Sequence, residues 1–194
     1  MVINVIKTID DSISAKEQLK KQNQIIYKIG ILISKCINKG GKVFFFGNGG
    51  SAADAQHISA ELVGRYQINR KGLPSIAFTT NTSVLTAIGN DFGYDVVFER
   101  QVKSIVTSDD VVVGISTSGE SANVINGIMA AKKIGAKTVG LTGLNGEKLA
   151  KVADIALKVP SQNTQRIQEC HIMVGHIICD IVETNITQKF KKNL

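Results

Sequence analysis

The chain of 194 residues lacks the sequence features of membrane-spanning, secreted and disulfide-rich proteins. It holds two prolines, three cysteines and no tryptophan, and no run of about 18 apolar residues that would predict a membrane span. The start of the chain lacks the basic region and the small-residue cleavage site of a secretory signal. The cysteines show no CxxC spacing, so neither a disulfide framework nor a zinc ribbon is expected. We therefore expect a cytoplasmic protein.

The chain is basic: 23 basic and 16 acidic residues give a formal net charge of +7. A basic protein can attract nucleic acid, anionic membrane or phosphorylated metabolites. The lysines are scattered, and no basic run is interleaved with aromatic residues. A lysine-rich solvated surface is therefore favoured. A nucleic-acid partner rests on the charge alone, and we expect neither that partner nor a membrane.

Residues 1–40 read as a helical arm of a single domain that continues over residues 41–194. Isoleucines recur in the arm at spacings of three and four, and a very polar middle predicts two helices or one bent helix. Gly40 and Gly41 end it. The arm carries no chemistry, so its apolar faces are expected to pack against the core or against a second subunit.

From residue 42, short apolar runs alternate with helical patterns. The expected strands are 43–46, 76–79, 111–115, 138–141 and 155–159, and the expected helices are 52–63, 83–88, 94–106, 122–134, 147–151 and 161–190. Continuous apolar runs suit strands buried on both faces, and this alternation predicts a parallel sheet between two layers of helices. Ligands of such sheets bind at the carboxyl ends of the strands.

A glycine-rich turn, Gly47–Asp54, follows the first expected strand. Backbone N–H groups in such a turn can approach an anion at the start of a helix. No lysine follows the glycines, which excludes a P-loop, and Ala52 stands at the third position of GxGxxG, so a dinucleotide site is weakly supported. A tight structural turn is the alternative. Asn48 and Ser51 favour a ligand, because both side chains can form hydrogen bonds.

The loop after the third strand holds four hydroxyl residues within six positions, namely Ser116, Thr117, Ser118 and Ser121. A simple helix N-cap needs one hydroxyl. Several hydroxyls together with free helix N–H groups can hold a phosphate without cationic side chains. This loop is therefore interpreted as a phosphate site.

A third loop candidate is Asn90-Asp91-Phe92-Gly93. Asparagine, aspartate and glycine are common in turns, and an ordinary turn is the favoured interpretation. The alternative places Asp91 against sugar hydroxyls.

All three histidines lie on two expected helices. His57 and Glu61 are four residues apart and share one helix face. The closing helix carries Gln168, Glu169, His171 and His176, and spacing alone does not choose which of its polar residues align with His176. A lone histidine is usually a structural residue. Together, however, the two helices could form a mixed nitrogen and oxygen site suited to zinc.

These stretches resemble the phosphoheptose isomerases of the sugar-isomerase (SIS) domain superfamily. The matching residues are 46–51 to Asp54, His57 to Leu62, 64–66, 89–93, 114–119, 121–125, and 166–169 with His171 and His176. The resemblance spans essentially the whole chain. It implies a three-layer αβα fold of the flavodoxin type, with a five-stranded parallel sheet and an N-terminal helical arm.

The resemblance also implies an activity. The family interconverts sedoheptulose 7-phosphate and D-glycero-D-manno-heptose 7-phosphate, the first step toward the heptose of bacterial lipopolysaccharide or capsule. The implied phosphate residues are Ser116, Thr117, Ser118 and Ser121, and the implied sugar-binding residues are Asn48, Gly49, Gly50, Ser51, Glu61, Asn90, Asp91 and Gln168. Glu61 and His176 would be the acid/base pair of an enediol mechanism, which needs no nucleotide cofactor.

The family further implies one zinc ion per subunit, held by His57, Glu61, Gln168 and His176, and a homotetramer with active sites between subunits. One departure is Gln165, where some members have an acidic residue; one hydroxyl contact depends on it. The alternative is a non-catalytic SIS regulator of the replication-initiator-associating type. Such a regulator is not expected to keep the pair Glu61 and His176.

Overall fold

The computed structural model describes residues 4–192 and contains a five-stranded parallel sheet in the order β2-β1-β3-β4-β5. The strands are β1 Val43–Gly47, β2 Ser75–Ala77, β3 Val111–Ser116, β4 Lys137–Gly143 and β5 Ile155–Val159. This is the strand order of flavodoxin-like folds, with the topological switch between β1 and β3. The predicted fold class is confirmed.

The sheet is covered on both faces, as the continuous apolar runs predict. Every residue of β1 and β3 is buried. Along β1 the side chains alternate between two cores, because Val43 and Phe45 face one cluster while Phe44 and Phe46 face the other. The aromatic rings of Phe46 and Phe98 stack at 4.8 Å in the second core.

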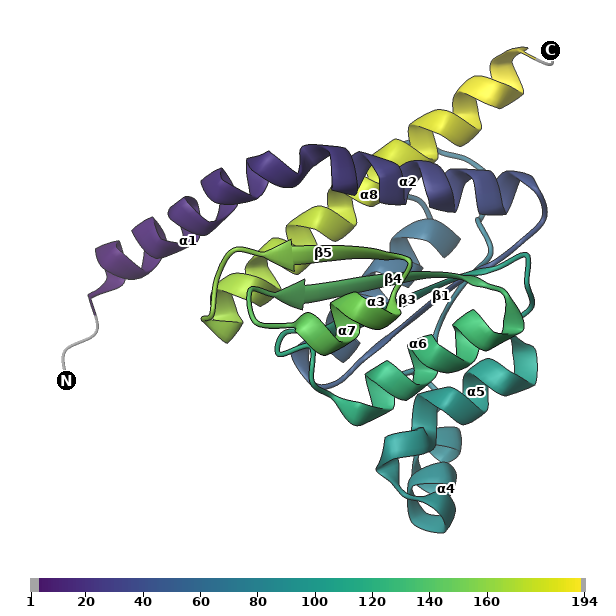
Figure 1. Ribbon diagram of the computed structural model, residues 1–194. Coiled ribbons are helices and arrows are strands. Elements are labelled where there is room, and N and C mark those ends of the chain that lie inside the picture. The colour runs from purple at the N-terminus through teal and green to yellow at the C-terminus, as the bar shows by residue number, and fades with distance from the viewer. Residues whose placement is uncertain (1–3, 193–194) are drawn as a thin grey trace.

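Helices form the two outer layers, as Figure 1 shows. The first layer contains α2 Asn23–Asn38, α3 Gly50–Val63 and α8 Thr164–Lys192, and the second contains α5 Val97–Ile105, α6 Ala122–Ile134 and α7 Glu147–Val152. The helix α4 Thr82–Phe92 and the short η2 Tyr94–Val96 lie beyond α5. All three histidines lie in the first layer, on α3 and α8.

The N-terminal arm consists of α1 Val5–Leu19, the 3-10 turn η1 Lys20–Gln22 and then α2. α2 buries Ile26, Ile29 and Ile33 in the core, whereas α1 extends away from the body (Figure 1). The apolar side chains Val5, Ile6, Ile9 and Ile13 of α1 are exposed. The expected packing of this stripe against the core is therefore not found within residues 4–192.

Three sequence expectations about elements are wrong. Asn90 and Asp91 lie in the last turn of α4, and the chain leaves the helix only at Gly93, whose φ is 87°. The expected helix 94–106 is divided into η2 and α5. The edge strand β2 ends at Ala77 rather than at residue 79, because a turn follows in which the Thr80 hydroxyl donates to the Ala77 carbonyl. Within the described part of the chain, no helix is long and apolar enough to span a membrane.

Candidate active site

The loops that follow β1 and β3 meet at the topological switch of the sheet. Gly47 pairs with Ile115, so the two strands end side by side. The side-chain amides of Asn48 and Asn123 exchange two hydrogen bonds of 2.9 Å across the gap. Asn123 is buried and was not anticipated from the sequence. It fixes the glycine loop against the hydroxyl loop, at the place where flavodoxin-like folds bind ligands.

The hydroxyl loop gathers its side chains around Ser116. The Ser116 Oγ is 3.1 Å from the Ser121 Oγ and 3.4 Å from the Ser118 Oγ, and it accepts a hydrogen bond from the Gly119 N–H. Ser121 is the N-cap residue of α6, but its side chain does not cap the helix. The first-turn N–H groups of α6 therefore have no side-chain cap, which suits an anion.

The start of α3 is also without a side-chain cap. Its N-cap residue is Gly49, at φ 54°, which has no side chain that could cap the helix. The amide of Gln168 on α8 lies against Gly50, where a Cβ atom would be 2.5 Å from the Gln168 Nε2. A side chain at position 50 would therefore displace the Gln168 amide. This contact places Gln168 beside the glycine loop.

His57, Glu61 and His176 converge at the side of the sheet where α3 meets α8. The Nε2 atoms of the two histidines are 3.0 Å apart, and the His57 Nε2 is 3.4 Å from the Glu61 Oε1. One ligating atom from each of the three residues lies within 4.8 Å of the others. His57 is exposed, while Glu61 and His176 are half-buried. A ligand can therefore reach the group from solvent.

This group fits a zinc ion by its donor chemistry. Two imidazole nitrogens and one carboxylate oxygen are a common catalytic zinc set, which leaves a fourth position open. Two nitrogens on one tetrahedral zinc ion lie about 3.3 Å apart, close to the spacing of the two imidazoles. Whether Gln168 adds a fourth ligand stays a prediction.

The two helices can bring these groups together because a glycine lies at their crossing. A Cβ atom on Gly175 would be 2.6 Å from the Cγ1 and Cδ1 atoms of Ile58. Ile58 follows His57, and Gly175 precedes His176. The missing side chain therefore lets α8 approach α3 at the level of the site.

The ambiguity about the closing helix is resolved by its other polar residues. Glu169 accepts a hydrogen bond of 2.6 Å from Ser12 and pairs with Arg166, so it faces the arm. His171 is fully buried, and its Nε2 lies 3.3 Å from the Thr142 carbonyl oxygen. Burial lowers the pKa of His171 to about 4, while the Thr142 carbonyl opposes the shift. His176 is left as the histidine of α8 that meets α3.

Comparison with known proteins identifies the family. Residues 9–143 match the model of the SIS domain. A phosphoheptose isomerase of Aquifex aeolicus is 52% identical over 166 residues, with 86% of this chain and 87% of the relative covered. A second, of Sulfurimonas denitrificans, is 54% identical over 184 residues, covering 88% and 94%. The chain belongs to the SIS domain family.

Solved structures agree with this SIS domain. The phosphoheptose isomerase of Neisseria gonorrhoeae superposes with a TM-score of 0.88 at 43% identity, covering 93% of this chain and 97% of the other. The enzyme of Francisella tularensis gives a TM-score of 0.90 at 34% identity, covering 93% and 96%. The chain is therefore an SIS domain of the phosphoheptose isomerase type over nearly its whole length.

Two predicted sugar-binding residues of this SIS domain lie apart from the loops. Asn90 and Asp91 are exposed on α4 and hydrogen-bond to each other at 2.8 Å. The contacts found among the described residues do not join them to Asn48 or Ser116. Gln165 is exposed at the start of α8, where its N–H donates to Asn163.

Sequence reasoning assigned no role to two residues of this SIS domain that border the histidines. Asp54 lies one turn before His57 on α3; burial raises its pKa to about 6, against the opposing charge of His57. Its helical spacing of three from His57 was a usable signal. The ring of Tyr66 stacks on His176, with centroids 5.9 Å apart and an interplanar angle of 24°. Spacing gives no such signal for Tyr66, because it lies in a loop.

Proposed function

We propose that this chain is a phosphoheptose isomerase, which interconverts sedoheptulose 7-phosphate and D-glycero-D-manno-heptose 7-phosphate through an enediol. One observation carries the proposal: the Glu61 carboxylate and the imidazoles of His57 and His176 lie within 4.8 Å of one another, on α8 and on α3, the helix that begins at the glycine loop. The relatives at about half identity that bear the name phosphoheptose isomerase support it.

The proposed binding mode uses the two loops. Ser116, Thr117, Ser118 and Ser121 would hold the phosphate with hydroxyl groups and with the N–H groups that begin α6. Asn48, Gly49, Gly50, Ser51 and Gln168 would line the sugar. Asn90 and Asp91 would bind the sugar only if they reach a site in another subunit, which a homotetramer with sites between subunits would allow. The bound phosphate supplies binding energy that orients the reacting carbons.

The proposed chemistry moves one proton between neighbouring carbons. The Glu61 carboxylate removes a proton from C1 of the ketose, exchanges it with water at this half-buried position, and delivers a proton to C2, which converts the ketose to the aldose. The C2 carbonyl oxygen becomes negative during the first transfer, an N–H of His176 gives it a proton, and His176 takes a proton back from the C1 hydroxyl as the aldehyde forms. No electrons leave the sugar, so the reaction needs no redox cofactor.

We also propose that zinc binds to His57, Glu61 and His176, with Gln168 as a further ligand. When bound, zinc would polarise the sugar oxygens as a Lewis acid. His57 would hold the metal through Nε2, and Glu61 would be fixed through one oxygen. The test is isothermal titration of zinc into the metal-free protein. Wild type should bind one ion per chain, and His57→Gln should bind it about 10-fold or more weakly. Equal affinity would remove His57 from the ligand set.

The activity is tested by an NMR time course with sedoheptulose 7-phosphate. The chain should form the aldose, and Glu61→Gln and His176→Gln should each lose about 100-fold or more of the turnover while remaining folded. Glu99→Gln is the control, since Glu99 pairs with Lys103 on α5, outside the site. Full turnover by both site variants would reject the assigned roles. No product together with tight binding to a replication initiator would favour the non-catalytic regulator.

The biological setting belongs to the same proposal. The three cysteines are free and buried, which supports a cytoplasmic location. The exposed apolar stripe of α1 supports assembly through the arm into a homotetramer. The product would enter the synthesis of heptose for lipopolysaccharide or capsule.

A further inference from the structure

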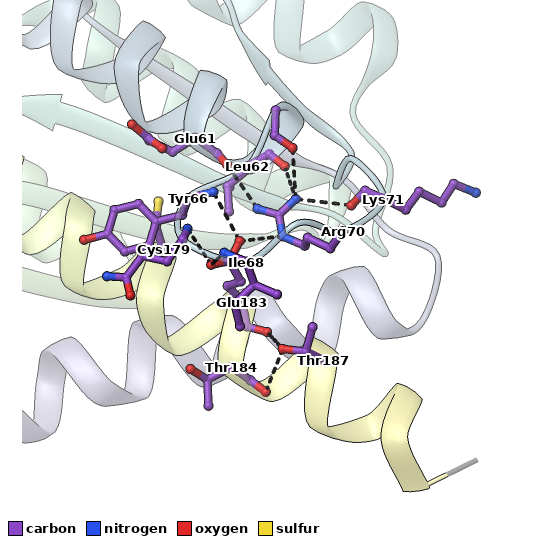
Figure 2. A network of polar contacts seen from close by, with 12 residues as sticks. Glu61, Leu62, Tyr66, Ile68, Arg70, Lys71, Cys179, Glu183, Thr184 and Thr187 are labelled. Carbon is purple, nitrogen blue, oxygen red and sulfur yellow. Dashed lines mark hydrogen bonds and ion pairs between the residues drawn. The ribbon is translucent and has the colours of Figure 1, made fainter. Parts of the chain in front are cut away.

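A buried ion pair lies close to the site and takes no part in the chemistry described above. The Arg70 Nε is 2.9 Å from the Glu183 Oε1, and the side chains are only 6% and 1% exposed. Charged side chains are seldom buried to this extent unless they are paired, because removing them from water is costly. Both residues of the pair also form hydrogen bonds with the surrounding backbone (Figure 2).

The Glu183 carboxylate binds three consecutive N–H groups of the loop that follows α3. Its oxygens accept hydrogen bonds from Tyr66 at 3.1 Å, Gln67 at 2.7 Å and Ile68 at 2.8 Å. Burial alone would raise the pKa of Glu183, but these N–H groups and Arg70 outweigh it and the pKa is lowered. The carboxylate is thus charged, and it fixes the backbone of this loop to α8.

Arg70 binds the other end of the same loop, where α3 terminates. Its Nη1 donates to the carbonyls of Leu62 at 2.9 Å and Gly64 at 3.4 Å, and its Nη2 donates to the Glu61 carbonyl at 3.1 Å. A cation at the last carbonyls of a helix satisfies acceptors that have no partner within the helix. In Figure 2, Arg70 lies between the end of α3 and Glu183 on α8. The backbone of Glu61 itself is one of its partners.

The loop also carries an aromatic ring to the site. Tyr66, the first residue bound by Glu183, stacks its ring on the imidazole of His176. His176 and Glu183 are seven residues apart on α8, so they share one face of that helix. Arg70 and Glu183 are therefore linked to Glu61 through its carbonyl and to His176 through Tyr66.

We propose that Arg70 and Glu183 are positioning residues of the isomerase, which hold the Glu61 backbone and the Tyr66 ring so that Glu61 and His176 face the same sugar carbons. This inference rests on the proposed roles of Glu61 and His176. If the pair were merely structural, breaking it would lower kcat no more than breaking any other contact that contributes equally to stability. A positioning role and a purely structural role are therefore distinguished by comparing kcat between variants of equal stability.

The first experiment releases the loop. Glu183→Gln keeps the side-chain shape but removes the charge, and Arg70→Lys keeps the charge but removes the planar fork. We expect kcat to fall about 10- to 100-fold in each, with KM changed less than about 3-fold, because positioning and not binding is lost. Hydrogen exchange at the amides of Tyr66, Gln67 and Ile68 should accelerate in Glu183→Gln.

The matched control is Val182→Ala, one residue before Glu183. Val182 is fully buried in the core, so this variant lowers the melting temperature and removes none of the hydrogen bonds that Glu183 makes to the loop. It should keep the wild-type kcat. A loss of kcat in Val182→Ala equal to that in Glu183→Gln would show that lowered stability alone explains the effect, and would overturn the proposal.

The second experiment tests whether Tyr66 transmits the effect. Tyr66→Ala should lower kcat, Tyr66→Phe should restore most of it by keeping the ring, and Tyr66→Ala combined with Glu183→Gln should be little worse than the more damaging single change. An unchanged kcat in Tyr66→Ala, or losses that simply multiply, would overturn the proposal. Tyr66→Ala decides alone if Glu183→Gln does not fold.

Failure of this inference is distinguishable from failure of the proposed function. If Glu61→Gln is inactive while Glu183→Gln and Tyr66→Ala turn over normally, only the positioning role is lost. If Glu61→Gln itself turns over normally, the assignment of the active site is wrong.

Discussion

Two histidines of α8 have opposite surroundings although only five residues separate them. Five residues rotate a helix by about 140° beyond a full turn, so the side chains point to different sides. His171 is fully buried beside the Thr142 carbonyl, whereas His176 meets His57 and Tyr66 at the site. The same residue type therefore supports the fold at one position and the site at the other.

Burial of His171 gives the fold a pH dependence. Its pKa is about 4 in the folded chain against an ordinary value of 6.5, so as pH falls below 6.5 the unfolded chain takes up a proton that the folded chain refuses. The free energy of unfolding should fall by about 3 kcal/mol between pH 6.5 and pH 4 from this residue. Denaturant unfolding of wild type and His171→Asn at several pH values measures it.

Comparing wild type with His171→Asn separates the contribution of His171 to the pH dependence of stability from that of Asp54. The pKa of Asp54 is raised to about 6 from 3.8, so Asp54 favours the folded state as pH falls and opposes the effect of His171. Both proteins share that contribution. The variant should show the smaller loss of stability in acid. An equal loss in both would contradict the burial argument.

At the scale of elements, the crossing of α3 and α8 builds the site. Gly175→Ala would place a methyl group within 2.6 Å of Ile58, so α8 must shift or Ile58 must rotate. We expect a loss of about 1–3 kcal/mol in the free energy of unfolding and a weaker zinc affinity, because His57 and His176 separate. Denaturant unfolding and zinc titration measure both effects.

The control for this substitution is Gly89→Ala in α4. A Cβ atom there would meet only the Tyr94 ring, at an ordinary 3.7 Å. The free energy of unfolding should stay the same or rise, since alanine is the better helix former. If Gly175→Ala bound zinc as tightly as wild type, the close crossing would not be what unites the site.

The sequence predicted the strands and the loops that follow them more completely than it predicted the site. Buried apolar runs revealed the strands, and the parallel topology then implied that ligands bind at the carboxyl ends of the strands. That the loops after β1 and β3 are neighbours became visible only in the structure. Local composition misled at Asn90 and Asp91, whose turn preference was overridden by the continuing helix α4.

The meeting of α3 and α8 was not predictable from spacing. It depends on Gly175 and Ile58, which are 117 residues apart, and no periodic pattern connects them. The resemblance to a family, not the residue pattern, joined Glu61 to His176. For the same reason the roles of Tyr66 and Glu183 became visible only in the structure.

At the scale of the whole molecule, α1 is the element least explained by the single chain. Its side chains Ile6, Ile9 and Ile13 are 73%, 54% and 53% exposed, and they form one stripe by spacing. If this stripe joins subunits, the triple change to serine should dissociate the proposed homotetramer and leave the circular dichroism spectrum unchanged. Sedimentation velocity measures the mass. Ile105→Ser, at an exposed position on α5, is the control, and an unchanged mass in the triple variant would contradict the role of α1.

The central claim is that Glu61 moves the proton of the sugar with His176 beside it. The most direct measurement is deuterium incorporation during incubation of sedoheptulose 7-phosphate with the enzyme in D₂O, followed by NMR. The account predicts deuterium at C2 of the aldose with wild type, and labelling at least about 100-fold slower with Glu61→Gln. Labelling by Glu61→Gln as fast as by wild type would contradict it.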